Sequence, residues 1–486
     1  MMLSGRRARI YTISYESILI FLITLTACYT NVNGAFTYTM GEFPAPWGNE
    51  IRAGLVESVL ALFFIIVLFA SITAGWHFLK TDIDESKINF YFSLINLLTA
   101  ALMAIVWTND IFTGYVFLEI MTLTSCGILI VREIGRTTLA AVRYMILNLM
   151  GSGLFLLGVV LLYDISGQLL MVPMRESLTE LVSQSPDSMR AISLSIGILT
   201  IGLAIKSGLF PFHFWMPDTY GWATPTSASI LSSLVSKAYI FLLIKIYCRS
   251  IGFEIIAKSG INNIIFVLGI CGIIFGSFSA LAAGNIDRMV AFSSAAQIGY
   301  IYMGIGLGTL SGITAALFQI LCHSVTKSLL FLSTPYLAEV SGNSLLFKNL
   351  QGSAHRNKTA GLFFTLASLS MIGIPIFAGF SMKIIFADAA VDYGGKKFFL
   401  VMGALAVSSL LNVMYFMRTI VRIYSKNNDN ANDNSITFKK AAGDEDEIDA
   451  FSYIASGILL TLANLFLGLY SPVAVEAIIK GLSNFS

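Results

Sequence analysis

The stretch from Gly202 to Pro211 reads GLAIKSGLFP, and it contains the features that decide the fold. An apolar run carries Lys206, and glycine and proline then interrupt the run at Gly208 and Pro211. This pattern is typical of a membrane helix that is broken beside a hydrated cavity, because freed backbone groups are tolerated in a bilayer only against protein or water. The alternative is that Lys206 lies at a helix end and extends its stem to the membrane edge.

The composition of the whole chain also indicates a membrane protein. Of the 486 residues, 56% are hydrophobic and 12% are charged, and the mean hydropathy is +0.78. Soluble domains carry about 25% charged residues, so this chain could not cover its apolar surface in water. The composition excludes a soluble enzyme, a disordered chain and a disulfide-rich secreted scaffold. The net charge of +2 argues against a nucleic-acid-binding surface.

About thirteen stretches are long and apolar enough to cross the bilayer as helices, whereas the alternating polarity of a membrane β-barrel is absent. We therefore predict an all-α polytopic membrane protein. The first stretch contains LTAC at 25–28 and is similar to a lipoprotein signal peptide, but we expect it to be kept as a helix. The predicted spans are 14–29, 53–76, 88–107, 111–131, 137–163, 191–210, 223–247, 262–283, 289–308, 314–336, 359–387, 398–424 and 451–470.

Lysine and arginine are more frequent in the loops on the N-terminal side of the predicted spans than in the loops on the other side. This bias predicts a cytoplasmic N-terminus and a C-terminus across the membrane. Arg52, Lys245 and Arg249 count among the loops of the opposite side in this assignment. Residues 426–449 are rich in asparagine and acidic side chains, which predicts a polar cytoplasmic loop.

The five cysteines are scattered without a CxxC spacing, and the chain has only four histidines. Ligation of an iron–sulfur cluster, a haem or another metal is therefore not expected, and we predict no cofactor in this chain.

Charged residues inside the apolar stretches are the best candidates for function, because a charge at the bilayer centre costs about 2.5–3.5 kcal/mol. Such residues usually face a protein interior or a wet cavity. His323 and Lys327 are four residues apart, which places them on one helix face. We expect the candidates to form a proton relay; the alternative is that they are structural pairs that only lock helices together. The six candidates are Glu119, Lys206, Lys237, His323, Lys327 and Lys383.

A second interruption resembles the first. Gly373 and Pro375 interrupt the apolar stretch 359–387, and Lys383 follows eight residues after the proline. Two interrupted helices, each with a lysine and in separate halves of the chain, indicate an internal repeat. The alternative at this position is a simple proline kink, with Lys383 near the membrane edge.

The turn that follows the first break carries His213 and Asp218, which are candidates for an entrance to the relay. A purely structural turn is the equal alternative. Arg143 lies close to a span end, where we expect it to reach the membrane edge or to pair with Glu133.

Three motifs carry a resemblance to a known family. They are KSGLFPFHFWMPD at 206–218, which continues to TPTSA at 224–228, YTMGEFPAPWGNEI at 38–51 and DRMVAFSS at 287–294. The chain resembles the antiporter-like subunits that are shared by complex I, membrane-bound hydrogenases and Mrp-type sodium/proton antiporters. The resemblance covers about residues 38 to 425, and the segment at 38–51 is similar to a hairpin of the Mrp and hydrogenase branches.

The resemblance implies two inverted five-helix repeats, each with one broken helix. Glu119 and Lys206 match the family's glutamate–lysine pair, Lys237 its connecting lysine, His323 with Lys327 its central pair, and Lys383 its terminal lysine. The chain departs from the family in that it lacks a first span and has Gln297 where relatives often have histidine. The implied division is 1–86 for the N-terminal helices and hairpin, 87–247 and 262–425 for the repeats, 426–449 for the polar loop and 450–486 for the C-terminal helix.

The resemblance further implies a non-redox, proton-translocating subunit of a multi-subunit complex in the cell membrane. The complex would be an Mrp-type antiporter or a ferredoxin-linked, hydrogenase-like respiratory complex. Expected partners are other membrane subunits, iron–sulfur subunits in the redox-driven case, protons and lipids, with sodium left open as a second ion. The alternatives are an inactive spacer subunit, a subunit of ordinary NADH:quinone oxidoreductase and a self-contained solute transporter.

Overall fold

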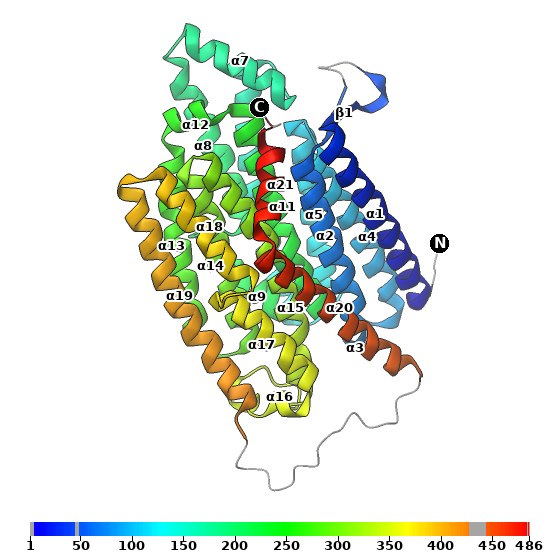
Figure 1. Ribbon diagram of the computed structural model, residues 1–486. Helices are drawn as coiled ribbons and strands as arrows, with labels where there is room; N and C mark the ends of the chain where they lie inside the picture. Colours follow the sequence, from blue (N-terminus) through cyan, green and yellow to red (C-terminus); the bar gives the residue numbers. More distant parts are fainter. Residues whose placement is uncertain (1–3, 44–47, 427–443, 484, 486) are drawn as a thin grey trace.

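The apolar stretches of the sequence form long helices that pack into one bundle in the computed structural model of the protein (Figure 1). The structure describes residues 4–43, 48–426, 444–483 and 485. A two-stranded antiparallel sheet lies at one end of the bundle, with Phe36 opposite Ala53 and Thr39 opposite Glu50. The C-terminal end of the chain lies at this same end (Figure 1).

The elements follow one another in a simple order. They are α1 (Gly5–Asn33), β1 (Phe36–Thr39), β2 (Glu50–Ala53), α2 (Leu55–Ala74), α3 (Trp76–Asp82), α4 (Glu85–Trp107), α5 (Ile111–Ile130), α6 (Gly135–Ser166), α7 (Met171–Gln184), α8 (Ser188–Ser207), α9 (Met216–Trp222), α10 (Pro225–Ile230), α11 (Ser236–Lys245), α12 (Phe253–Ser259), α13 (Ile261–Ala282), α14 (Ile286–Leu307), α15 (Leu310–Glu339), α16 (Ser353–Arg356), α17 (Lys358–Ile372), α18 (Ala378–Tyr393), α19 (Gly395–Tyr424), α20 (Asp444–Leu469) and α21 (Ser471–Ser483). Short 3-10 turns occur at Met40–Glu42, Phe212–Trp215 and Phe347–Asn349.

Within the described residues, 12 helices are long and apolar enough to cross a membrane. The all-α membrane architecture is therefore as predicted. The remaining expected span, 359–387, is divided into the shorter helices α17 and α18. The division has a local cause, because Gly373 takes a left-handed conformation with φ of 92° and Pro375 has no backbone N–H with which to continue a helix.

The helix ends at Ser207 and Ile372 have the same local structure. Gly208 also has a positive φ, of 77°, and its N–H donates to the carbonyl oxygens of the preceding turn at 3.0 and 3.2 Å. The N–H of Gly373 does the same at 3.1 and 3.0 Å. Glycine adopts this conformation without the steric cost of a side chain, so each helix ends in a closed glycine cap.

Two helices lie entirely inside the bundle. One runs from α10 through α11 and contains two π-helical segments, Leu231–Val235 and Ile246–Ile251. All its residues from Thr226 to Ile251 are buried, as are residues 312–334 of α15. Lipid therefore contacts neither helix along these stretches, and their polar side chains must find partners inside the protein.

The expected position of three basic residues in loops is wrong. These residues are Arg52, Lys245 and Arg249. The central helix continues to Ile251, so Lys245 and Arg249 are buried within it, and Arg52 is buried on β2. The central helix extends beyond the predicted span end at 247, because Lys245 and Arg249 find partners inside the protein. The expected polar loop 426–449 lies mostly outside the described residues, and α20 begins at Asp444 rather than at 450.

Replacing Gly208 by alanine should destabilise the protein by roughly 1–2 kcal/mol or more, because a side chain disfavours the left-handed conformation and the added Cβ would lie 2.1 Å from Cε of Met216. Thermal unfolding in detergent measures the effect. Gly153→Ala in α6 is the matched control, since its Cβ would meet no atom within 4 Å. Equal unfolding temperatures for the two variants would contradict the argument.

Candidate functional site

The six predicted side chains come from five helices that cross the bundle. α8 packs against α11, α11 against α15, and α15 against α18, while α6 packs between α5 and α8. The four inner side chains are buried, whereas Glu119 and Lys383, at the two ends of the series, are partly exposed. The positions are Glu119 on α5, Lys206 on α8, Lys237 on α11, His323 and Lys327 on α15 and Lys383 on α18.

Glu119 and Lys206 form an ion pair. The Nζ atom of Lys206 lies 3.7 Å from Oε2 of Glu119 and donates a hydrogen bond of 2.6 Å to Oγ1 of Thr122. Ser152 on α6 donates a hydrogen bond to the same carboxylate oxygen. The ammonium group is fully buried, while the Glu119 side chain keeps 22% of its surface exposed. The pair therefore connects the interior of the bundle to its surface.

Hydroxyl groups occupy the space between Lys206 and the next lysine. The Lys206 ammonium lies 5.3 Å from the ring centre of Tyr239, whose hydroxyl is 3.2 Å from Oγ1 of Thr122. Tyr220 contacts Ser236, the residue before Lys237, at 3.2 Å between hydroxyl oxygens. No direct hydrogen bond or ion pair joins Lys206 to Lys237 among the described residues.

A series of serines links Lys237 to Lys327. Lys237 donates to the carbonyl oxygen of Ser232, and the hydroxyl of Ser232 lies 3.0 Å from that of Ser294 on α14. The neighbouring Ser293 accepts a hydrogen bond from Lys327. Lys327 therefore contacts α14 directly, whereas Lys237 is connected to the neighbouring Ser294 through Ser232.

His323 faces the second helix break. Both ring nitrogens are buried without a hydrogen-bond partner, and the ring lines a small cavity with Gln319, Ser370 and Gly379. This cavity reaches the ends of α17 and α18, where Lys383 donates to the carbonyl oxygen of Ile372. This cavity of about 10 Å³ has room for one water, which would give a partner to a ring nitrogen that has none among the described residues.

The two residues proposed for an entrance lie at one end of the first break. Asp218 pairs with Arg143 at 2.9 Å and with Arg288 at 3.3 Å. His213 is buried, and its Nδ1 atom has no hydrogen-bond partner. Phe214 and Trp215, which come directly after His213 in the sequence, line a cavity of about 340 Å³ together with Arg143.

The expected pairing of Arg143 with Glu133 is wrong. The two residues are ten positions apart along α6 and the turn before it, which corresponds to about 15 Å of helix. Arg143 instead meets Asp218, and Glu133 pairs with Lys87.

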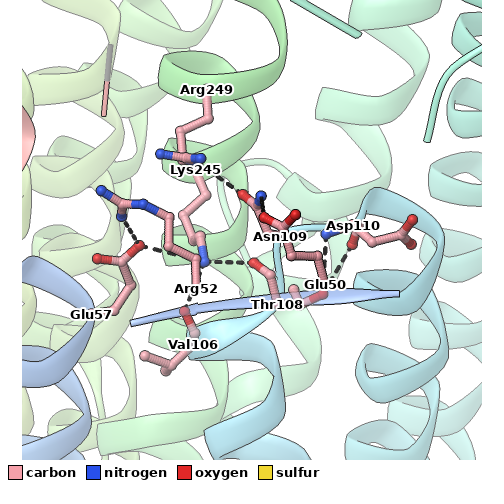
Figure 2. Close-up of polar contacts among 9 residues, drawn as sticks. All are labelled: Glu50, Arg52, Glu57, Val106, Thr108, Asn109, Asp110, Lys245 and Arg249. Atoms are coloured by element: carbon pink, nitrogen blue, oxygen red, sulfur yellow. Dashed lines mark hydrogen bonds and ion pairs between the residues drawn. The ribbon is translucent and has the colours of Figure 1, made fainter. Parts of the chain in front are cut away.

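A second cluster of buried charges was not predicted from the sequence, and Figure 2 shows how its members face one another. Arg52 donates to Oε1 of Glu57 at 2.5 Å, and Nζ of Lys245 lies 3.7 Å from the same oxygen. Lys245 also donates to the carbonyl oxygens of Val106, at 2.9 Å, and of Thr108, at 2.6 Å. All three charged side chains are buried.

The cluster extends to the hairpin through amide and carboxylate groups. Arg249 donates to Oδ1 of Asn109 at 3.1 Å, and Asn109 donates to Oε1 of Glu50 on β2 at 2.6 Å (Figure 2). The ring of Phe485 covers both guanidinium groups, with its centre 5.1 Å from Arg52 and 5.6 Å from Arg249. The spacing of Lys245 and Arg249, four residues apart on one helix face, was the available signal for this cluster.

The described residues contain no group of three or more His, Cys, Asp or Glu side chains that could hold a metal ion. What the arrangement supplies is a series of buried, exchangeable protons on lysine, histidine, hydroxyl and carboxyl groups.

The sequence and the fold both match known proteins. The family described as "NADH:quinone oxidoreductase/Mrp antiporter, TM" matches residues 108–411, which is more than half of the chain. The chain belongs to this family. It is therefore an antiporter-like membrane subunit of the Mrp and complex I type.

Members of the NADH:quinone oxidoreductase/Mrp antiporter family from both branches align over most of the chain. NADH-quinone oxidoreductase subunit N of Desulforudis audaxviator (strain MP104C) is 32% identical over 393 residues, which cover 80% of this chain and 75% of that protein. One Na⁺/H⁺ antiporter subunit of Bacillus subtilis (strain 168) is 24% identical over 418 residues, with 86% and 81% covered. The fold matches a chain in the structure of the Mrp complex from Dietzia sp. DQ12-45-1b with a TM-score of 0.85 and 20% identity, covering 99% of this chain and 93% of that one.

Glu57→Gln should destabilise the protein by roughly 3–5 kcal/mol, because the substitution removes the carboxylate that forms an ion pair with the fully buried Lys245. Thermal unfolding of the purified protein measures the loss. Glu254→Gln is the matched control, since Glu254 also pairs with a lysine, Lys258, but on the exposed surface. A Glu57→Gln protein that unfolds like this control would show that the cluster carries no stabilising charge pair.

Proposed function

We propose that this protein is a proton-translocating subunit of a multi-subunit membrane complex and that protons move along the series from Glu119 to Lys383. The observation that carries the proposal is the course of this series through the bundle. Its inner members are buried, its two end members reach the bundle surface, and hydroxyl groups lie along the series, with a cavity large enough for one water beside His323. Lysine, histidine and carboxyl side chains can each take up and release a proton.

The inner part of the series has an unbalanced charge, which favours transfer over a purely structural role. Lys237, His323 and Lys327 act on one another electrostatically, and no carboxylate pairs with any of them among the described residues. Three adjacent buried cations would repel strongly. A proton that arrives at one of these groups therefore favours the departure of a proton from another.

The Glu119–Lys206 pair is suited to control the direction of transfer. While the pair is closed, the carboxylate stabilises the charge on Lys206; if it opens, the buried ammonium loses this support and its proton is driven towards Lys237. The cavity near Arg143 and the turn with His213 and Asp218 would supply protons from the surface. We expect water to bridge the gaps that no direct hydrogen bond closes.

The partly exposed side chain of Glu119 supports assembly with other subunits. Glu119 keeps part of its surface exposed in the middle of a membrane helix, and contact of an ionisable group with lipid is costly. A neighbouring membrane subunit that covers this surface would remove the cost and would also receive or deliver the proton.

We further propose that the two glycine-capped breaks, at Gly208–Pro211 and Gly373–Pro375, mark corresponding positions of two inverted repeats, 87–247 and 262–425. The identical hydrogen-bond pattern at the two helix ends supports this division. The proposed location is the cell membrane with the N-terminus in the cytoplasm, as the distribution of basic residues predicts.

Among the complexes, we favour an Mrp-type sodium/proton antiporter or a ferredoxin-linked, hydrogenase-like complex, because the sequence segment 38–51 resembles a hairpin of these branches and the fold matches a chain of an Mrp complex. The 32% identity to an NADH-quinone oxidoreductase subunit N favours ordinary complex I as the second candidate. Identification of the co-purifying subunits by mass spectrometry separates the candidates: small membrane subunits alone, or iron–sulfur subunits as well.

Lys206→Ala and Glu119→Gln should each reduce proton transport by the assembled complex about tenfold or more, because a relay in series stops at a missing carrier. Transport is measured with a pH-sensitive dye in membrane vesicles, and assembly is checked on native gels. Lys258→Ala, which removes an exposed lysine, is the control.

Normal transport in both variants would overturn the relay and would favour the spacer alternative. Transport by the purified chain alone in liposomes would instead identify a self-contained transporter.

A further inference from the structure

A cavity of about 410 Å³ lies at the opposite end of the bundle from the hairpin, where α1 and α4 begin. None of the relay residues lines it. Its wall is built from the first turns of α1, the start of α3 and α4 and the beginning of α20. The residues that matter for the argument are Arg6, Arg9, Trp76, Lys80, Glu85 and Asp449.

Three cationic side chains line this cavity, against two carboxylates. Arg9 packs over the ring of Trp76 at 4.7 Å, and the ammonium of Lys80 lies 5.7 Å from the same ring. The Nε atom of Arg9 is buried and has no hydrogen-bond partner among the described residues. The arrangement holds the charged groups in place and leaves a donor unsatisfied.

Asp449 shows which ligand chemistry the wall can hold. Its carboxylate oxygens lie 3.6 Å from Arg9 and 2.6 Å from Lys80, so the two cations jointly bind an oxyanion that belongs to the chain. α1 begins at the same cavity, and the side chain of its N-cap residue Ser4 makes no capping hydrogen bond. An uncapped N-terminus of a long helix adds partial positive charge and backbone N–H donors.

We propose that this cavity binds the phosphate headgroup of an anionic phospholipid. The arginine and lysine side chains would contact the phosphate oxygens, and Trp76 would pack beside the headgroup. Basic pockets between membrane helices favour such headgroups. A lipid rather than a free phosphate ion is indicated by exposed apolar side chains close in sequence to lining residues: Ile10 follows Arg9, and Phe90 comes two residues after Ile88.

The test uses the full chain reconstituted in phosphatidylcholine vesicles with a minor fraction of brominated lipid. Bromine quenches nearby tryptophan fluorescence, and Trp76→Phe identifies the part of the signal that comes from Trp76. Brominated phosphatidylglycerol should quench this part at a lower mole fraction than brominated phosphatidylcholine does. Arg6→Gln and Lys80→Gln should each weaken that preference about fivefold, the effect typical of one basic side chain near a membrane.

Arg7→Gln is the matched control, because Arg7 is an exposed arginine next to Arg6 and does not line the cavity. Its preference should stay largely unchanged. Circular dichroism confirms that each variant remains folded.

Two results would overturn the proposal. Equal quenching by both brominated lipids, or an equal loss in the Arg6 and Arg7 variants, would mean that only general surface charge attracts the lipid. Displacement of phosphatidylglycerol by millimolar inorganic phosphate would assign the cavity to a free anion. Neither result bears on proton transport, so the proposed function is tested separately.

Discussion

The cost of a charge without a partner inside a bilayer governs this structure. Two clusters of buried cations find partners in different ways. Around Glu57, three cations share carboxylate, carbonyl and amide oxygens, and a phenyl ring closes over two of them. Around His323, the cations share only hydroxyl and carbonyl oxygens, and the ring nitrogens have no partner. The first arrangement gives every charge a fixed partner and stabilises the bundle, whereas the second has the groups that the proposed proton relay requires.

The sequence predicts much of the fold for a physical reason. A helix that spans lipid must be apolar for about 20 residues, so its position is visible in the sequence. The helix ends at Ser207 and Ile372 are also visible, because glycine followed by proline stops a helix wherever it occurs. The lysines next to these breaks can also be recognised from the sequence alone, because charged residues are rare within apolar stretches.

Contacts that depend on three-dimensional arrangement could not be predicted. Lys245 and Arg249 lie at and just beyond the end of the predicted span 223–247, and only the packing of α4 and the hairpin against the central helix shows that they are buried. Asp218 binds arginines from two different helices, α6 and α14, and no spacing along the chain indicates that meeting. The order of the relay side chains across the bundle likewise comes from helix packing rather than from sequence position.

The two π-helical segments of the central helix show how the number of residues in a helix determines the direction of the charged side chains that follow. Each segment widens one turn by accommodating an additional residue, and one of them ends directly before Ser236 and Lys237. Loss of a single residue within a π segment would leave a regular α-helix with the residues beyond it on their present faces, whereas loss of a residue elsewhere in the central helix would rotate everything beyond it by about 100°. Insertions and deletions outside the π segments are therefore constrained even where every individual side chain is replaceable.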